Sequence, residues 1–132
     1  EEQFKKYRRS WDIPPPSLNT NSKYSSHNNP LYKGIKSIPN TESLKNTYER
    51  VVPYFEKNIE KQLKQKKNVL ISAHGNTIRA LGKKIFNISD KSINLLEIPT
   101  GNPLVIDFDI SGTFLSAKYL DESRKAEIIS NR

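Results

Sequence analysis

The sequence predicts an α/β fold, and three stretches of the chain carry that prediction. Residues 41–63 have the apolar spacing of a long amphipathic helix. Residues 68–73 form a short, nearly all-apolar run typical of a strand buried on both faces, and a helical pattern follows over 77–86. Residues 103–120 indicate a hairpin of two strands. Helix, buried strand and helix in this order favour a layered α/β/α fold with a mixed, mostly parallel sheet and an antiparallel edge.

The first 40 residues are expected to be largely irregular. Residues 1–10 are charged and fit the end of a helix. The three prolines at 14–16 stop any helix, because each fixes its own φ and lacks a backbone N–H. Residues 17–29 are rich in Ser and Asn and predict a surface loop. Three side chains of this part are expected to find something to pack against: Trp11, Ile13 and Tyr24.

The long helix is predicted from its start and from its apolar face. Asn40 and Thr41 offer a capping side chain, and Glu42 places an acid in the first turn. Pro53 lies inside the pattern and should bend the helix. A further short helix, after those over 41–63 and 77–86, is expected to open at Ser89. The apolar face of the long helix consists of Leu44, Tyr48, Val51, Val52, Phe55, Ile59 and Leu63.

Composition limits the classes of function. The chain has 132 residues, enough for one small domain, but only 34% of them are hydrophobic. We therefore expect the chain to depend on further sequence to complete its core. The net charge of +8 attracts anions such as nucleic acid, acidic lipid or a phosphorylated metabolite, and it equally fits a lysine-rich solvated surface. Four lysines crowd the end of the long helix: Lys61, Lys64, Lys66 and Lys67.

Several site types and locations are excluded or disfavoured. The chain has no cysteine, so it has no disulfide, thiolate metal site or cysteine nucleophile. Its two histidines, His27 and His74, are far apart in sequence, and no metal-ligand cluster is visible. No apolar run reaches the length of a membrane span and no signal peptide opens the chain, so a cytoplasmic location without membrane contact is expected. No recognition-helix pattern supports nucleic-acid binding.

The most informative local pattern is the junction between the predicted buried strand and the following helix. His74, Gly75 and Asn76 lie there. Ligands bind beyond the carboxyl ends of strands in open α/β sheets, and a helix start offers free amides and a positive dipole end to an anion. Gly75 allows a tight turn or close approach of a ligand, and His74 can donate to a phosphoryl group. The alternative is a histidine that only caps the turn.

Arg8 and Arg9 form a second candidate. Adjacent guanidinium groups supply planar donors that bind phosphate or carboxylate, often with two parallel hydrogen bonds. Taken alone, the pair is equally explained as a solvated basic pair beside the aromatic Trp11.

Four groups of motifs in this chain can be compared with known families. They are EEQ at 1–3 with RRS at 8–10 and DIPPP at 12–16, TESLK at 41–45 with RVVPY at 50–54, AHGN at 73–76 with RAL at 79–81, and IPTG at 98–101 with PLV at 103–105. Together they resemble the cofactor-dependent phosphoglycerate mutases, in the order and spacing of that family. The resemblance covers nearly the whole chain and corresponds to the carboxyl-terminal half of such an enzyme.

The resemblance implies a histidine-phosphatase fold and the interconversion of 3-phosphoglycerate and 2-phosphoglycerate in glycolysis and gluconeogenesis. It implies 2,3-bisphosphoglycerate as primer, a phosphohistidine intermediate and no metal. By position His74 matches the second active-site histidine, Gly75 and Asn76 match phosphate contacts, and Arg8 and Arg9 match the pair that grips the substrate. The implied ligand is a small phosphorylated metabolite. Members of the family are often dimeric or tetrameric, which allows a homo-oligomer.

The departures from the family pattern matter for activity. The Arg-His-Gly motif of the phosphate-accepting histidine is absent from 1–132, as is the acidic residue that protonates the leaving oxygen. Tyr7 stands where the family usually has Trp, and Thr77 where it has Ser. We therefore expect residues 1–132 to be the carboxyl-terminal part of a single domain and to be inactive alone. The alternatives are a bisphosphoglycerate mutase or phosphatase on the same fold, a non-catalytic basic binding module, and a remnant that only assembles with a partner.

Overall fold

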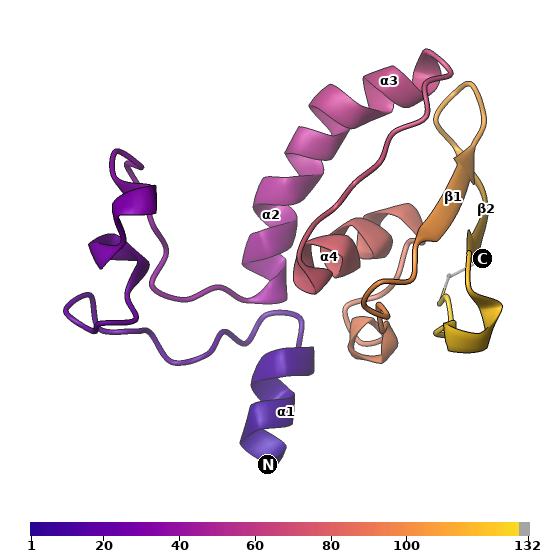
Figure 1. Ribbon diagram of the computed structural model, residues 1–132. Helices are drawn as coiled ribbons and strands as arrows, with labels where there is room; N and C mark the ends of the chain where they lie inside the picture. The colour runs from indigo at the N-terminus through magenta and orange to yellow at the C-terminus, as the bar shows by residue number, and fades with distance from the viewer. Residues whose placement is uncertain (130–132) are drawn as a thin grey trace.

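The computed structural model describes residues 1–129 (Figure 1). Four α-helices and one hairpin make up its regular structure. They are α1 (Glu2–Arg9), α2 (Leu44–Tyr54), α3 (Glu60–Lys64), α4 (Gly75–Ile85), β1 (Leu104–Phe108) and β2 (Phe114–Tyr119). Single 3₁₀ turns lie at Ser26–Asn28, Pro30–Tyr32, Ile93–Leu95 and Glu122–Arg124. Within residues 1–129 no helix has both the length and the apolar character to cross a membrane.

The long helix predicted over 41–63 is confirmed, with a later start and an interruption. Ser43 is its N-cap: the Ser43 side chain accepts from the Asn46 N–H, and the Asn46 side chain accepts from the Ser43 N–H. This reciprocal pair outcompetes the expected start at Asn40 because it satisfies two N–H groups at once. Pro53 lies within α2, and a π-helical turn, Phe55–Ile59, follows before α3.

The strand predicted over residues 68–73 is not formed, and this part of the prediction was wrong. The segment is extended, yet none of its backbone N–H or C=O groups bonds to a described residue. It runs as an unpaired extended segment between α3 and α4, beside the helix formed by α2 and α3 (Figure 1). Leu70, expected to be buried, is 91% exposed. The physical reason is that a strand needs a neighbour to satisfy its backbone, and residues 1–129 supply none.

The hairpin predicted over 103–120 is confirmed. β1 and β2 pair antiparallel from Leu104 opposite Tyr119 to Phe108 opposite Phe114. Asp109 stabilises the turn, because its side chain accepts from the backbone N–H groups of Ser111 and Thr113. The described residues therefore form a small α/β protein with a two-stranded antiparallel sheet, and they contain no parallel strand pair.

The core lies between α4, the start of α2 and the hairpin. Phe86, Ile93 and Leu96 are its largest fully buried side chains. Phe86 meets Phe114 of the hairpin edge to face, with ring centroids 5.4 Å apart. Trp11 packs on Tyr48 in the same way, as expected, whereas Tyr24 is 76% exposed and its predicted packing was wrong. Trp11, which follows α1 in the chain, also packs against this core.

Candidate anion-binding site

The amino-terminal end of α4 is built around His74. His74 is the N-cap, and its Nδ1 accepts a hydrogen bond of 3.2 Å from the Asn76 N–H. The imidazole is therefore the cap foreseen as an alternative to a phosphate ligand, and the two roles are compatible because Nε2 stays available. His74, Gly75 and Asn76 are all exposed. The backbone N–H groups of Gly75 and Thr77 bond to no described residue, so the helix end presents donors to an anion.

Gly75 is explained by space and not by backbone strain. It is the first residue of α4, and its φ lies outside the positive range. The expected tight turn is therefore absent at this position. A Cβ built on Gly75 would meet nothing within 4 Å. The open space in front of its Cα agrees with the other expectation, the close approach of a ligand.

Arg79, one turn into α4, ties three parts of the chain together. Its Nε donates to the Leu96 carbonyl at 3.1 Å and its Nη2 to the Ile93 carbonyl at 2.9 Å. Its Nη1 donates to the Arg8 carbonyl and to Asn76 Oδ1, both at 3.3 Å. The end of α1, the start of α4 and the 3₁₀ turn at Ile93–Leu95 therefore meet at one guanidinium.

The bond from Arg79 fixes the orientation of the Asn76 amide. A guanidinium only donates, so the amide oxygen of Asn76 must face it. The amide nitrogen is then turned away from Arg79, and it bonds to no described residue. Asn76 consequently offers two N–H donors at the helix start, beside the free backbone N–H groups. This donor set suits a phosphoryl group.

The candidate arginine pair lies against the same end of α4. Arg8 approaches it through its backbone carbonyl, while its guanidinium carbon lies 5.4 Å from the centroid of the Phe4 ring. The Arg9 side chain forms an ion pair with Glu97, and both partners are partly exposed. The structure therefore brings α1 to the predicted site, with one guanidinium on an aromatic ring and the other paired to a carboxylate.

The charges of the three arginines act on one another. Burial is the first cause that lowers the pKa of Arg79, and the nearby positive charge of Arg9 lowers it further. Glu97 partly opposes this, and Arg8 again lowers the pKa. Like charges so placed repel, so an anion that enters between them is stabilised.

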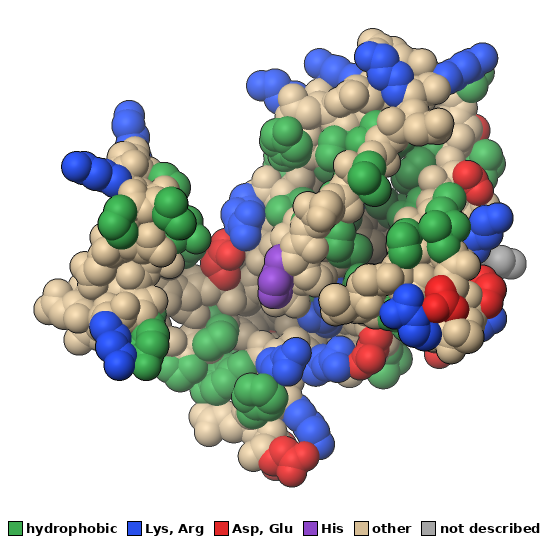
Figure 2. Space-filling model, viewed as in Figure 1, with side chains coloured by type: hydrophobic (Ala, Val, Ile, Leu, Met, Phe, Trp, Pro, Cys, Tyr) green, Lys and Arg blue, Asp and Glu red, His purple; other side chains and the backbone are tan. Residues whose placement is uncertain are grey.

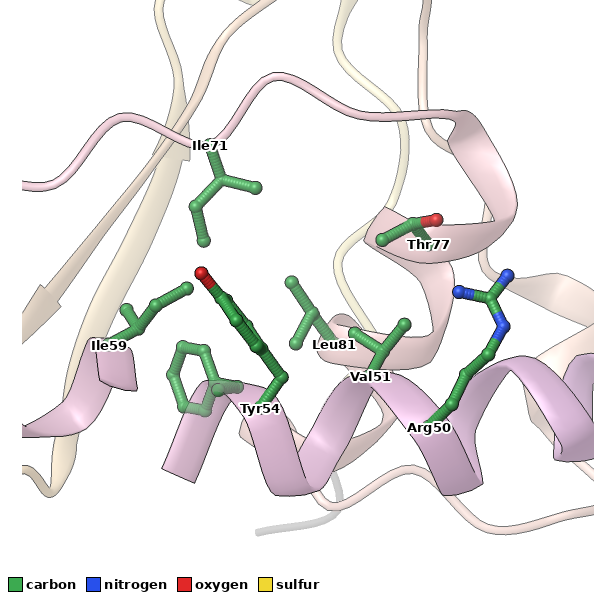
Figure 3. A pocket seen from close by; sticks show the side chains of 8 residues that line it. Arg50, Val51, Tyr54, Ile59, Ile71, Thr77 and Leu81 are labelled. Carbon is green, nitrogen blue, oxygen red and sulfur yellow. The ribbon is translucent and has the colours of Figure 1, made fainter. Parts of the chain in front are cut away.

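An apolar groove lies next to this site. It has a volume of about 340 Å³ and is formed by α2, the π-helical turn, residue 71 of the unpaired segment and α4. Ile71 points from the segment toward Tyr54 and Leu81, while Arg50 and Thr77 close one end (Figure 3). The groove has the character of a core surface, because apolar atoms dominate its lining.

The remaining candidate features lie elsewhere. The lysines at the end of α3 gather at the opposite end of the molecule from α1, at the top of Figure 2. His27 belongs to the loop before α2, where its Nε2 lies 2.9 Å from Asn40 Oδ1. Over residues 1–129, no three His, Asp or Glu side chains come together as a metal-binding group. Neither the lysines nor His27 contributes to the site at α4.

Two residues of this site were missed by reasoning from the sequence. Arg79 was noted only as part of a motif, and Glu97 was not considered. A partial signal was present, because Asn76 and Arg79 are three residues apart in a predicted helix and so share a face. The carbonyls of Ile93 and Leu96, which accept from Arg79, lie too far along the chain for any local pattern to indicate them.

Comparison with known proteins gives a family match over most of the chain. Residues 20–119 match the model of the histidine phosphatase superfamily (branch 1). A protein of Pelagibacter ubique is 47% identical over 131 residues, which are 98% of this chain and 55% of the relative. Relatives from Hyphomonas neptunium and Caulobacter vibrioides are 48% and 50% identical over 94% and 93% of this chain. All three are named 2,3-bisphosphoglycerate-dependent phosphoglycerate mutase, and this chain spans about half the length of each.

Proposed function

Because the chain belongs to the histidine phosphatase superfamily (branch 1), we propose that it supplies the phosphate-holding part of a 2,3-bisphosphoglycerate-dependent phosphoglycerate mutase. In this proposal it works in the cytoplasm on 3-phosphoglycerate and 2-phosphoglycerate. The observation that carries the proposal is the meeting of α1 and α4, where Arg79 bonds both the Arg8 carbonyl and Asn76 Oδ1. The names and identities of the relatives support the reaction.

Each side chain has a role that follows from its chemistry. The free N–H groups at the start of α4 and the Asn76 amide hold phosphoryl oxygens. His74 donates from Nε2 while its Nδ1 stays in the cap. Arg8 and Arg9 hold the carboxylate of the substrate or the second phosphate of the primer, since a guanidinium binds both groups bidentately. These residues position charged groups, which is most of what catalysis of phosphoryl transfer requires.

The same donor set fits 2,3-bisphosphoglycerate. The primer carries two phosphates and a carboxylate, and the site offers two separate groups of donors, at α4 and at the end of α1. When bound, the primer supplies the phosphoryl group that charges the enzyme. The residues of this chain bind and orient it, and we assign the phosphate-accepting histidine to the part of the protein that this chain does not cover.

We further propose that residues 68–73 become a strand when that other part is present. The six unbonded residues and the apolar groove beside Ile71 support this, because both are surfaces that a neighbouring strand would cover. The complete domain would then have the layered α/β/α form with a mixed, mostly parallel sheet. This chain would form its carboxyl-terminal part.

A chimera tests the proposed function. The part of the Pelagibacter relative that this chain does not cover is fused to residues 1–132, and 3-phosphoglycerate is supplied with 2,3-bisphosphoglycerate. We expect 2-phosphoglycerate as the main product. Accumulation of 2,3-bisphosphoglycerate or release of inorganic phosphate would instead indicate the bisphosphoglycerate mutase or phosphatase alternative. A folded chimera that binds none of these metabolites would overturn the proposal.

A further inference from the structure

Arg79 is the most deeply placed charged side chain of the described residues. Only 6% of the residue is exposed, and it is the one arginine in the set of buried polar residues. A buried guanidinium is costly unless its donors are satisfied, and Arg79 has four hydrogen bonds to four acceptors. Four of its five N–H groups are used in this way, and the side chain is buried, so Arg79 is placed to hold other residues of the chain and not to grip a ligand. Its role therefore lies in what it holds.

The two longer hydrogen bonds of Arg79, both of 3.3 Å, indicate its role. The bonds to Leu96 and Ile93 anchor the guanidinium in the core. The bonds to the Arg8 carbonyl and Asn76 Oδ1 share one nitrogen, Nη1, and both reach outward to the candidate site. One anchored nitrogen thus fixes the end of α1 and the Asn76 amide at the same time.

We propose that Arg79 is a positioning residue, which sets the arginine pair of α1 and the donor face of Asn76 for a phosphorylated carboxylic acid without touching it. The choice of ligand rests on the proposed function, whereas the positioning itself does not. Lysine cannot replace Arg79 here, because a single ammonium cannot span acceptors on three separate segments. The branched guanidinium of Arg79 therefore sets the distance between α1 and α4, because it bonds to both.

The first arm of the test needs no ligand. The chain has no cysteine, so Lys6→Cys gives a single attachment site for a spin label on the exposed face of α1. In the 15N-labelled chain the label should broaden the amide signals at the start of α4. Arg79→Lys should remove this broadening, while the dispersed hairpin signals of β1 and β2 show that the variant is still folded. Unchanged broadening in Arg79→Lys would overturn the positioning role.

The second arm measures binding of 3-phosphoglycerate. We expect Arg79→Lys to weaken it by about tenfold, the equivalent of one charge-assisted hydrogen bond. Arg124→Lys is the matched control, because Arg124 also donates two hydrogen bonds, to Asp121 at 2.6 Å and to the Gly101 carbonyl at 3.2 Å, but takes no part in the site. It should leave the affinity unchanged.

A double-mutant cycle separates positioning from general loosening of the fold. If Arg79 acts through Asn76, then Asn76→Ala should cost little further affinity once Arg79→Lys is present. Fully additive losses would contradict the proposal. A wild-type chain that keeps the label-dependent broadening but fails to bind 3-phosphoglycerate would overturn the proposed function and leave the positioning role supported by the first arm.

Discussion

His74 Nδ1 accepts the backbone N–H of Asn76 at 3.2 Å, so one ring nitrogen of the candidate catalytic histidine caps the helix that carries the other site residues. The bond fixes which ring nitrogen carries the proton in the neutral side chain: Nδ1 accepts and Nε2 donates. Stability and chemistry therefore depend on opposite edges of the same imidazole.

Two substitutions separate these edges. His74→Ala removes both the cap and the ring, and it should cost about 1 kcal/mol in the free energy of unfolding. His74→Asn restores a capping oxygen, so its stability in a urea titration should match that of the wild type. Both variants should lower turnover of the chimera by at least about a hundredfold, because a donor to the transferring group is lost. Near-normal turnover in His74→Asn would refute the catalytic assignment.

Glu97 forms an ion pair with the Arg9 guanidinium. A substrate carboxylate or phosphate that binds Arg9 must displace this partner, so Glu97→Gln should tighten binding of 3-phosphoglycerate. The gain is limited to about fivefold, because exposed ion pairs contribute about 1 kcal/mol or less. Glu122→Gln is the control, since Glu122 forms a comparable ion pair with Lys125 outside the site. Weaker binding in Glu97→Gln, measured by calorimetry, would show that the carboxylate helps the ligand instead.

Leu70 is 91% exposed beside a backbone segment without partners, which predicts association through this edge. Leu70→Asp should lower the self-association constant of the chain by at least about tenfold, because a buried leucine contributes about 1.5–3 kcal/mol. Sedimentation velocity over a concentration series measures it. Leu115→Asp, at a leucine that is 61% exposed on β2, should have a much smaller effect. Equal effects of the two variants would argue against residues 68–73 as the surface through which the chains associate.

Asp121 gives the fold a dependence on acid. Its hydrogen bond from Arg124, followed by the one from Ser123, lowers its pKa from 3.8 to about 2. The folded state therefore favours the ionised form, and the resulting stability is present above pH 3.8 and is lost as the pH falls toward 2. Asp121→Asn should flatten the change of unfolding free energy in this pH range, whereas Asp12→Asn, at an exposed aspartate, serves as the control. An identical pH profile in Asp121→Asn would contradict this.

Local patterns predicted those elements that need only local partners. The hairpin follows from its two short runs of strand-forming residues and from the turn residues at 110–112 between them, and α4 follows from its apolar spacing. The segment 68–73 failed because its apolar character describes a buried strand, while burial and pairing depend on chain outside this segment. α2 starts later than predicted, with Ser43 as its N-cap, because several neighbouring residues can cap a helix. The N-cap preferences of single residues do not decide between them.

The candidate site was only partly visible in the sequence. The group around His74 could be found because a helix start follows an apolar run. The link between Arg8 and Asn76 could not, since it passes through Arg79 and ends at Arg8 on a backbone carbonyl, which any residue supplies. The ion pair of Arg9 with Glu97 likewise joins two exposed residues far apart in sequence.

We propose that residues 1–132 hold the phosphate and depend on further protein for its transfer. The most direct measurement supplies radiolabelled 2,3-bisphosphoglycerate and 3-phosphoglycerate to residues 1–132 alone and to the chimera, and follows 2-phosphoglycerate formation and phosphate on histidine. We predict neither product with residues 1–132 alone, and both with the chimera, where the labelled histidine is not His74. Turnover or phosphohistidine in residues 1–132 alone, at a level near that of the chimera, would contradict the account and identify His74 or His27 as the phosphate acceptor.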